Sequence, residues 1–209
     1  MPAESPIVIL IRHGRTKGNT GPNPVVRAWS EFSLSREGLL DAELAAQQLK
    51  KFEPKMVYSS DLNRDRQTAE IISSSFDNIP YDCDFGLRTA NVGDLEEQPE
   101  ADTREIAERW YKEPWWQVPG GESLNEFLRR WYPAFDAKFD LAKECEACRP
   151  SVIVTHGRNI AAIHARSEMI PQCEAQMTIP GGLSLVYLDS SLEPKIEFLS
   201  RTEPILEDI

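Results

Sequence analysis

An arginine and a histidine stand directly after the first apolar stretch of the chain. Residues 7–11 are all apolar and four of the five are β-branched, which predicts a strand buried on both faces. Arg12, His13 and Gly14 follow at once. In an open α/β sheet, ligands bind at the carboxyl ends of the strands. An imidazole beside a guanidinium at this place indicates a nucleophile or base next to an anion. The alternative is a surface histidine in a basic loop.

A second histidine occupies the same kind of position. The chain has three histidines, and two of them follow the two strongest strand patterns: His13, and His156 after residues 151–154. Arg64 lies soon after a third predicted strand, residues 56–58. Arginine forks and backbone N–H groups at helix starts suit a tetrahedral oxyanion. They offset its charge, so that a neutral imidazole can attack phosphorus. The third histidine, His164, falls inside a predicted helix, and we expect it to be structural.

The surrounding pattern predicts the elements that position these side chains. Strands alternate with helices, which implies a parallel sheet covered on both faces. Ser35 is a plausible N-cap for the first helix, residues 59–61 cap the second, and Pro133 should kink or restart the fourth. The last two strands should form an antiparallel hairpin at a sheet edge. The predicted strands are 7–11, 56–58, one within 79–85, 151–154, 183–188 and 196–199, and the predicted helices are 39–49, 62–72, 101–112, 124–143 and 160–166.

Composition limits the class of protein. With 209 residues, of which 41% are hydrophobic and 27% charged, the chain fits one α/β domain over residues 1–209, at most with a small cap. The net charge of −11 argues against a nucleic-acid partner, so the positive potential for an anion must come from a few local arginines. No apolar run approaches the ~20 residues that span a bilayer, so no membrane partner is expected. The first residues lack a basic region, which predicts a cytoplasmic protein.

The cysteines give little indication of a metal or redox site. There are four, and Cys145 and Cys148 form one CxxC pair. No second pair and no nearby histidine completes a zinc set, and the pair ends a long polar helical pattern instead of following a strand. We expect free thiols in a reducing compartment.

Several motifs in a fixed order resemble those of one family. Arg12, His13, Gly14, Thr16 and Asn19 are similar to RHGxTxxN, and residues 59–69 match SSxLxRxxQTA. Further similar segments are 33–42 (PLTxxGxxQA), 119–123 (GGES), 155–157 (SHG) and, more weakly, 179–182 (IPNGS). The chain resembles the histidine phosphatase superfamily, in the branch that holds cofactor-independent phosphatases and phosphoglycerate mutases. The resemblance implies a three-layer α/β/α sandwich around a mostly parallel central sheet.

The resemblance also implies a mechanism and its residues. His13 would be the nucleophile that forms a phosphohistidine, which water then hydrolyses. Arg12, Arg64 and His156 would form the phosphate pocket. The further positions implied to bind phosphate or substrate are Asn19, Thr16, Gly157 and Glu122. No metal and no organic cofactor is implied.

One position departs from the family pattern. Family members carry a glutamate that protonates the leaving group in a segment that corresponds to residues 87–97, and Thr89 stands in its place. Threonine is no useful general acid near pH 7. Asp94 and Glu96 are the nearest carboxylates that could replace it, and Glu122 is a further one. The favoured interpretation of each is a solvated loop acid, because the whole chain is very acidic. Phosphoramidates and acyl phosphates need less help from an acid.

Specificity should come from the variable segments. Lys17, Arg27 and Trp29 follow the first motif, and the insert or lid region at about 86–122 is aromatic. Its aromatic residues are Trp110, Tyr111, Trp115 and Trp116. They either cover the pocket and stack on an organic group, or form a small satellite core under a long loop. The basic pair and tyrosine typical of a glycolytic mutase are not evident here.

We therefore predict a phosphatase that hydrolyses phosphomonoesters or phosphoramidates through His13. Its substrate would be a small phosphorylated molecule in preference to a phosphoprotein, and an oligomer is compatible with the sequence. Two alternatives remain: phosphoglycerate mutase-type phosphotransfer, and a weakly active or inactive phosphate-binding regulatory module, which Thr89 would allow.

Overall fold

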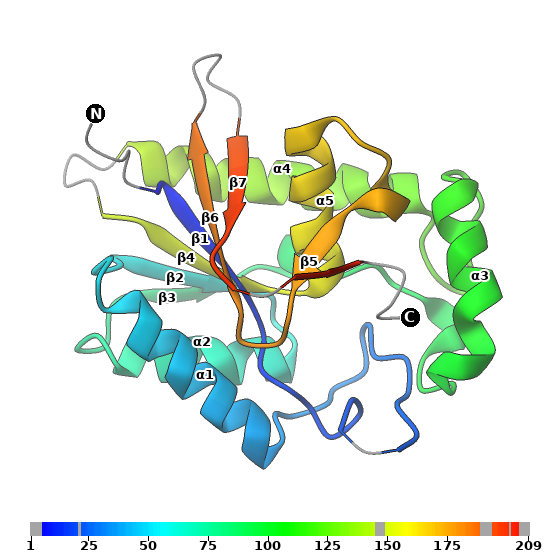
Figure 1. The fold of residues 1–209 in the computed structure, drawn as a ribbon, viewed down its shortest axis with the longest axis horizontal. Coiled ribbons are helices and arrows are strands. Elements are labelled where there is room, and N and C mark those ends of the chain that lie inside the picture. Colours follow the sequence, from blue (N-terminus) through cyan, green and yellow to red (C-terminus); the bar gives the residue numbers. More distant parts are fainter. Residues whose placement is uncertain (1–5, 21, 145–148, 189–193, 201, 205–209) are drawn as a thin grey trace.

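A six-stranded mixed sheet forms the centre of the molecule (Figure 1). The computed structural model describes residues 6–20, 22–144, 149–188, 194–200 and 202–204, so the Cys145–Cys148 pair lies outside the described residues. The strands of the sheet are β1 (Val8–Arg12), β2 (Met56–Ser59), β3 (Tyr81–Cys83), β4 (Ser151–Thr155), β6 (Leu183–Leu188) and β7 (Pro194–Phe198). Their order is β3-β2-β4-β1-β6-β7. The first four strands are parallel, and β6 runs antiparallel to both β1 and β7, as predicted for the late hairpin.

The two strands that carry the histidines are neighbours in this sheet. β1 and β4 pair in parallel with Arg12 opposite Thr155, and all residues of both strands are buried. The residues that follow, His13 and His156, therefore leave the sheet at the same edge. The backbone N–H of His13 donates to the carbonyl of Thr155 at 2.9 Å, which continues the ladder by one step.

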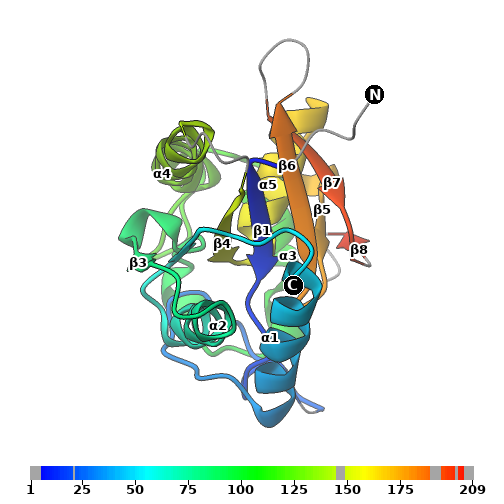
Figure 2. The same ribbon diagram turned by 90° about the vertical axis from the view of Figure 1, so that its left-hand side faces the viewer.

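Helices cover both faces of the sheet, which confirms the predicted three-layer arrangement (Figure 2). Alternate residues of β1 enter different cores: Ile9 and Ile11 pack with the helices on one face, and Val8 and Leu10 with those on the other. Helices α1 (Arg36–Leu49) and α2 (Asn63–Ser74) cover the first face. Helices α4 (Leu124–Lys143) and α5 (Gly157–Glu168) cover the second. Helix α3 (Glu100–Lys112) lies to one side, where Figure 1 shows it apart from the sheet.

One of the two predicted helix caps is confirmed. The Ser35 side chain accepts from the N–H of Gly38 and starts α1, as predicted. Ser123 starts α4 with a full capping box to Glu126. The predicted cap of α2 is wrong, since its N-cap is Leu62 and no side chain caps it. Helix α4 is also one continuous element across Pro133, where a kink or a restart was expected.

The aromatic segment before residue 120 belongs mainly to the core. Trp110 and Tyr111 are buried among the side chains of α4, and the indole N–H of Trp110 donates to the carbonyl of Glu122 at 2.8 Å. Neither residue lines the phosphate pocket described below. Trp115 is 71% exposed. Trp110 and Tyr111 therefore neither cover the pocket nor form a separate satellite core, because they are part of the main core on this face of the sheet.

The remaining elements are short. The three-residue helices are η1 (Phe85–Leu87), η2 (Gly93–Leu95) and η3 (Gln172–Glu174), and β5 (Gln176–Thr178) pairs with β8 (Thr202–Pro204) in a second sheet that the sequence did not indicate. His164 has the structural role expected of it. Its Nδ1 accepts from the backbone N–H of Gln176 at 2.9 Å, and its ring packs edge-on against Phe198. None of the helices among the described residues is long and apolar enough to cross a membrane.

Candidate active site

His13 lies at the carboxyl end of β1 with one ring nitrogen held by the backbone. Its Nδ1 is 2.8 Å from the carbonyl oxygen of Gly14, which can only accept a hydrogen bond. The proton of the neutral ring is therefore on Nδ1. The other nitrogen, Nε2, faces the guanidinium of Arg64, whose Nε donates to it at 3.3 Å. His13 consequently has an unprotonated Nε2, whose lone pair accepts from Arg64 in the free protein.

Arg64 lies behind both histidines and is fully buried. Besides His13 it contacts Nδ1 of His156 at 3.4 Å. Its terminal nitrogens also donate to the carbonyls of Ala28 and Ser30, at 2.6 and 3.0 Å. The two imidazole rings are edge-on, with centroids 5.2 Å apart. One cation from α2 thus fixes two rings from different strands, together with the loop before α1.

A buried carboxylate contacts the far side of His156. Oδ2 of Asp65 is 3.4 Å from Nε2 of His156 and 3.8 Å from Nε of Arg64, and its side chain is 0% exposed. The hydroxyl of Ser60 lies 3.3 Å from the same Nε2. Since Arg64 can only donate to Nδ1 of His156, the neutral ring carries its proton on Nε2, toward Asp65. The sequence motifs gave no role to Asp65.

Burial and positive neighbours keep both imidazoles neutral. Burial, followed by the charge of Arg64, lowers the pKa of His13 well below its ordinary value. The same two causes lower the pKa of His156. Burial raises the pKa of Asp65 to about 7, against the opposing effect of Arg64. A neutral His13 is the form in which an imidazole acts as a nucleophile.

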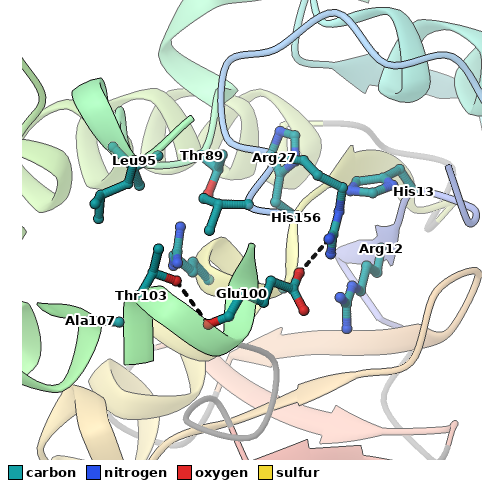
Figure 3. Close-up of a pocket in the computed structure, with 13 residues that line it drawn as sticks. Arg12, His13, Arg27, Thr89, Leu95, Glu100, Thr103, Ala107 and His156 are labelled. Atoms are coloured by element: carbon teal, nitrogen blue, oxygen red, sulfur yellow. Dashed lines mark hydrogen bonds and ion pairs between the residues drawn. The ribbon is translucent and has the colours of Figure 1, made fainter. Parts of the chain in front are cut away.

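The two histidines open into a cleft (Figure 3). Its lining contains three arginines, two histidines and a single carboxylate, so the potential is positive although the chain carries a net charge of −11. The N-terminus of α5 adds to this, because Gly157 lines the cleft and no side chain caps the helix. The lining residues are Arg12, His13, Val26, Arg27, Thr89, Val92, Leu95, Glu100, Thr103, Ala107, His156, Gly157 and Arg158.

Two of these residues are tightly held. Arg12 is buried and donates to the carbonyl of Thr178 at 3.1 Å. Gly157 leaves no room for a side chain, since a Cβ there would lie 2.2 Å from Sδ of Met177 and 3.4 Å from Cζ of Arg12. A glycine at position 157 therefore permits Arg12 and the start of α5 to lie together at the cleft.

Thr16 and Asn19 contact each other and are not among the lining residues. The side-chain oxygen of Asn19 accepts from the backbone N–H of Thr16 at 2.7 Å and from its hydroxyl at 3.3 Å. Thr16 is fully buried. In this structure both residues shape the loop after His13.

The carboxylates suggested as replacement acids lie elsewhere. Glu96 accepts from the backbone N–H groups of residues 28–30 and from the hydroxyl of Ser30. Asp94 is exposed in η2. Glu122 is bound by both Nε and Nη2 of Arg130 and by the N–H of Asn91, at 2.8 to 2.9 Å. None of the three lines the cleft, whereas Thr89 does.

Sequence reasoning did not single out Arg158 or Glu100. Arg158 directly follows the second histidine motif at the start of α5, so its position was a usable signal. Glu100 had no such signal, because its place at the cleft depends on how α3 meets residues 24–27. Within the part of the chain that the structure describes, no group of three or more His, Cys, Asp or Glu side chains could hold a metal ion.

Known proteins resemble this chain in sequence and in fold. The family model of the histidine phosphatase superfamily (branch 1) matches residues 8–191. A probable phosphoglycerate mutase, GpmB, of Yersinia pestis is 30% identical over 161 residues, which cover 75% of this chain and 72% of the relative.

Solved structures share the fold over nearly the whole chain. A mycobacterial glucosyl-3-phosphoglycerate phosphatase in complex with VO3 has a TM-score of 0.77 and 26% identity, covering 91% of this chain and 96% of that one. An α-ribazole phosphatase from Shigella flexneri has the same fold, with a TM-score of 0.74 at 21% identity over 93% of this chain and 95% of that one. With its two histidines and its arginines brought to one edge of the sheet, the chain belongs to the histidine phosphatase superfamily, branch 1.

Proposed function

We propose that this protein is a phosphatase that hydrolyses phosphomonoesters through a phosphohistidine on His13. The observation that carries the proposal is the state of His13. Its Nδ1 is held by the Gly14 carbonyl, its unprotonated Nε2 accepts from Arg64 in the free protein, and burial lowers its pKa. A neutral nucleophile next to three arginines is suited to attack a phosphoryl group whose charge those arginines offset.

The reaction proceeds in two steps. Nε2 of His13 attacks phosphorus, so that an N–P bond forms while the ester P–O bond breaks and the leaving oxygen takes up a proton to become an alcohol. Water then attacks the phosphohistidine, which releases inorganic phosphate and restores the imidazole. Arg12 and the start of α5 bind the phosphoryl oxygens, His156 lines the same cleft, and Arg64 holds both rings in position. The preferred substrate is a small phosphorylated molecule, since the cleft is compact and lined partly by Val26, Val92 and Leu95.

Mutase-type phosphotransfer is a second candidate, favoured by the similarity to a probable phosphoglycerate mutase. It would use the same phosphohistidine but return the phosphoryl group to the organic molecule in place of water. The products distinguish the two activities, because a mutase converts 3-phosphoglycerate to its isomer and a phosphatase releases inorganic phosphate from it.

The experiment combines trapping with product analysis. Wild-type protein is mixed rapidly with p-nitrophenyl phosphate, and acid-labile, base-stable phosphate on the protein is measured along with p-nitrophenol. A burst of p-nitrophenol, with label on the protein, is expected for wild type and is absent in His13→Asn. Incubation with 3-phosphoglycerate is expected to release inorganic phosphate.

His164→Gln is the matched control, since this third histidine lies away from the cleft, and it should retain the label and the burst. Binding of vanadate without label or turnover would overturn the proposal and indicate a phosphate-binding module. Isomerisation of 3-phosphoglycerate without net hydrolysis would overturn it in favour of a mutase.

A further inference from the structure

The cleft contains a carboxylate that the sequence motifs do not assign. Glu100 is the only acidic residue among those that line it, and Thr89, which lines the same cleft, has no proton to give near pH 7. Figure 3 shows the Glu100 carboxylate directed toward Arg27, on the side of the cleft where Arg12 lies. A carboxyl group is therefore present at the phosphate site, but it enters from a different segment of the chain.

The backbone fixes Glu100 firmly in this place. It is the first residue of α3, and its N–H donates to the carbonyl of Pro24 at 3.1 Å. The hydroxyl of Thr103 donates to its carbonyl at 3.1 Å. Nη1 of Arg27 bridges the Val25 carbonyl and the Glu100 carboxylate. The side chains of Arg27 and Glu100 are only 9% and 17% exposed, so the pair is largely shielded from solvent.

We propose that Glu100 is the proton donor of the reaction, in place of the glutamate that Thr89 replaces. The proposal rests on the phosphatase function proposed above. As Nε2 of His13 forms its bond to phosphorus, the ester P–O bond breaks, and the proton of the Glu100 carboxyl moves to the leaving oxygen to give a neutral alcohol. In the second step the Glu100 carboxylate takes a proton from the attacking water, and the acid is restored.

Substrate binding supplies the protonation state that this step needs. In the free protein Arg27 neutralises the Glu100 carboxylate. A phosphate monoester that enters between Arg12 and Arg27 as its monoanion competes for the guanidinium of Arg27. The proton that this phosphate carries passes to the Glu100 carboxylate, which Arg27 has released. The same competition frees the Glu100 side chain to turn toward the leaving oxygen.

The test compares two leaving groups in Glu100→Gln. The amide oxygen of glutamine can still accept from Arg27, so the fold and the arginine position are preserved. With glycerol phosphate, whose alkoxide needs a proton to leave, kcat/KM should fall on the order of 10²–10⁴-fold. With p-nitrophenyl phosphate, whose phenolate leaves unprotonated, it should change less than about 5-fold, and the phosphohistidine label should persist.

Two further variants make the result specific. Glu105→Gln, an exposed carboxylate on the same helix, should leave both substrates unaffected. Thr89→Glu in the Glu100→Gln background places a carboxyl at the other wall of the cleft. Its kcat/KM for glycerol phosphate should be at least about 10-fold higher than that of Glu100→Gln alone.

Equal loss on both substrates in Glu100→Gln would overturn the proposal, because it would identify Glu100 as a residue that only positions Arg27. Unchanged activity on glycerol phosphate would overturn it as well. Absence of label from wild-type protein with p-nitrophenyl phosphate would instead contradict the phosphatase mechanism itself, so the two failures are distinguishable.

Discussion

The carboxylate of Asp65 lies 3.4 Å from Nε2 of His156, inside the protein and away from solvent. Asp65 directly follows Arg64 in α2, so the two charges that hold the histidines come from adjacent residues. Arg64 faces the Nδ1 side of His156, and Asp65 faces the Nε2 side. This pairing orients the ring at the cleft, and it makes the stability of the protein depend on the protonation of a buried acid.

The first prediction concerns Asp65→Asn and the pH dependence of stability. Burial raises the pKa of Asp65 from its ordinary value to about 7. When folding raises the pKa of a carboxyl group, its protonated form stabilises the folded protein. This contribution to the free energy of unfolding is complete below the ordinary pKa and is lost as the pH rises through about 7. Relative to wild type, the free energy of unfolding of Asp65→Asn should therefore increase between pH 5 and 8, as measured by urea titration. Asp82→Asn, at an exposed position, is the control. A constant difference across this range would contradict the prediction.

The second prediction concerns the pH dependence of the first chemical step. Because burial and Arg64 lower the pKa of His13 well below its ordinary value, the nucleophile stays neutral under mildly acidic conditions. The rate constant of the p-nitrophenol burst should therefore not fall tenfold for each pH unit below pH 6.5, as it would if His13 became protonated there. Rapid-mixing kinetics from pH 5 to 8, corrected for ionisation of the substrate, provide the measurement. A titration centred near 6.5 would show that His13 is not shielded as described.

Glu96→Gln provides the third prediction. The Glu96 carboxylate accepts from the N–H groups of residues 28–30. The carbonyls of Ala28 and Ser30 in turn accept from Arg64. In the variant, the NH2 group of the glutamine amide faces some of these N–H groups and cannot accept from them. The charge-assisted hydrogen bonds lost in this way are worth about 1.5–3 kcal/mol. Activity should fall by the same factor on p-nitrophenyl phosphate and on glycerol phosphate, because the effect passes through Arg64. A loss confined to glycerol phosphate would assign the proton donor to Glu96 instead of Glu100.

The fourth prediction separates core from cleft in the aromatic insert. Trp110 is 4% exposed and packs against Tyr111 and Phe127 without lining the cleft. Trp110→Ala should therefore lower the free energy of unfolding by about 3–5 kcal/mol. KM for p-nitrophenyl phosphate should change less than about 3-fold at a temperature where the variant is folded. Trp115→Ala, at a mostly exposed position, should leave stability nearly unchanged. A large rise in KM for Trp110→Ala would favour the interpretation as a lid.

Much of the fold and the centre of the site could be read from local patterns. The apolar runs 7–11 and 151–154 identify β1 and β4, and each strand is followed at once by its histidine. Parallel neighbours end at one sheet edge, so the proximity of His13 and His156 follows from the strand assignment alone. The motif around Arg64 could likewise be recognised, because its residues are contiguous in the chain.

The partners of these groups could not be read in the same way. Glu96, Glu100 and Glu122 are similar acids in one acidic segment, and their sequence neighbours do not distinguish them. Glu96 binds the loop at 28–30, Glu122 binds Arg130, and Glu100 reaches the cleft because α3 begins against Pro24. Likewise, Asp65 is one residue from Arg64 but acts on a ring 91 positions further along the chain. Local propensity is a property of adjacent residues, whereas the environment of a charge depends on which distant segments pack around it.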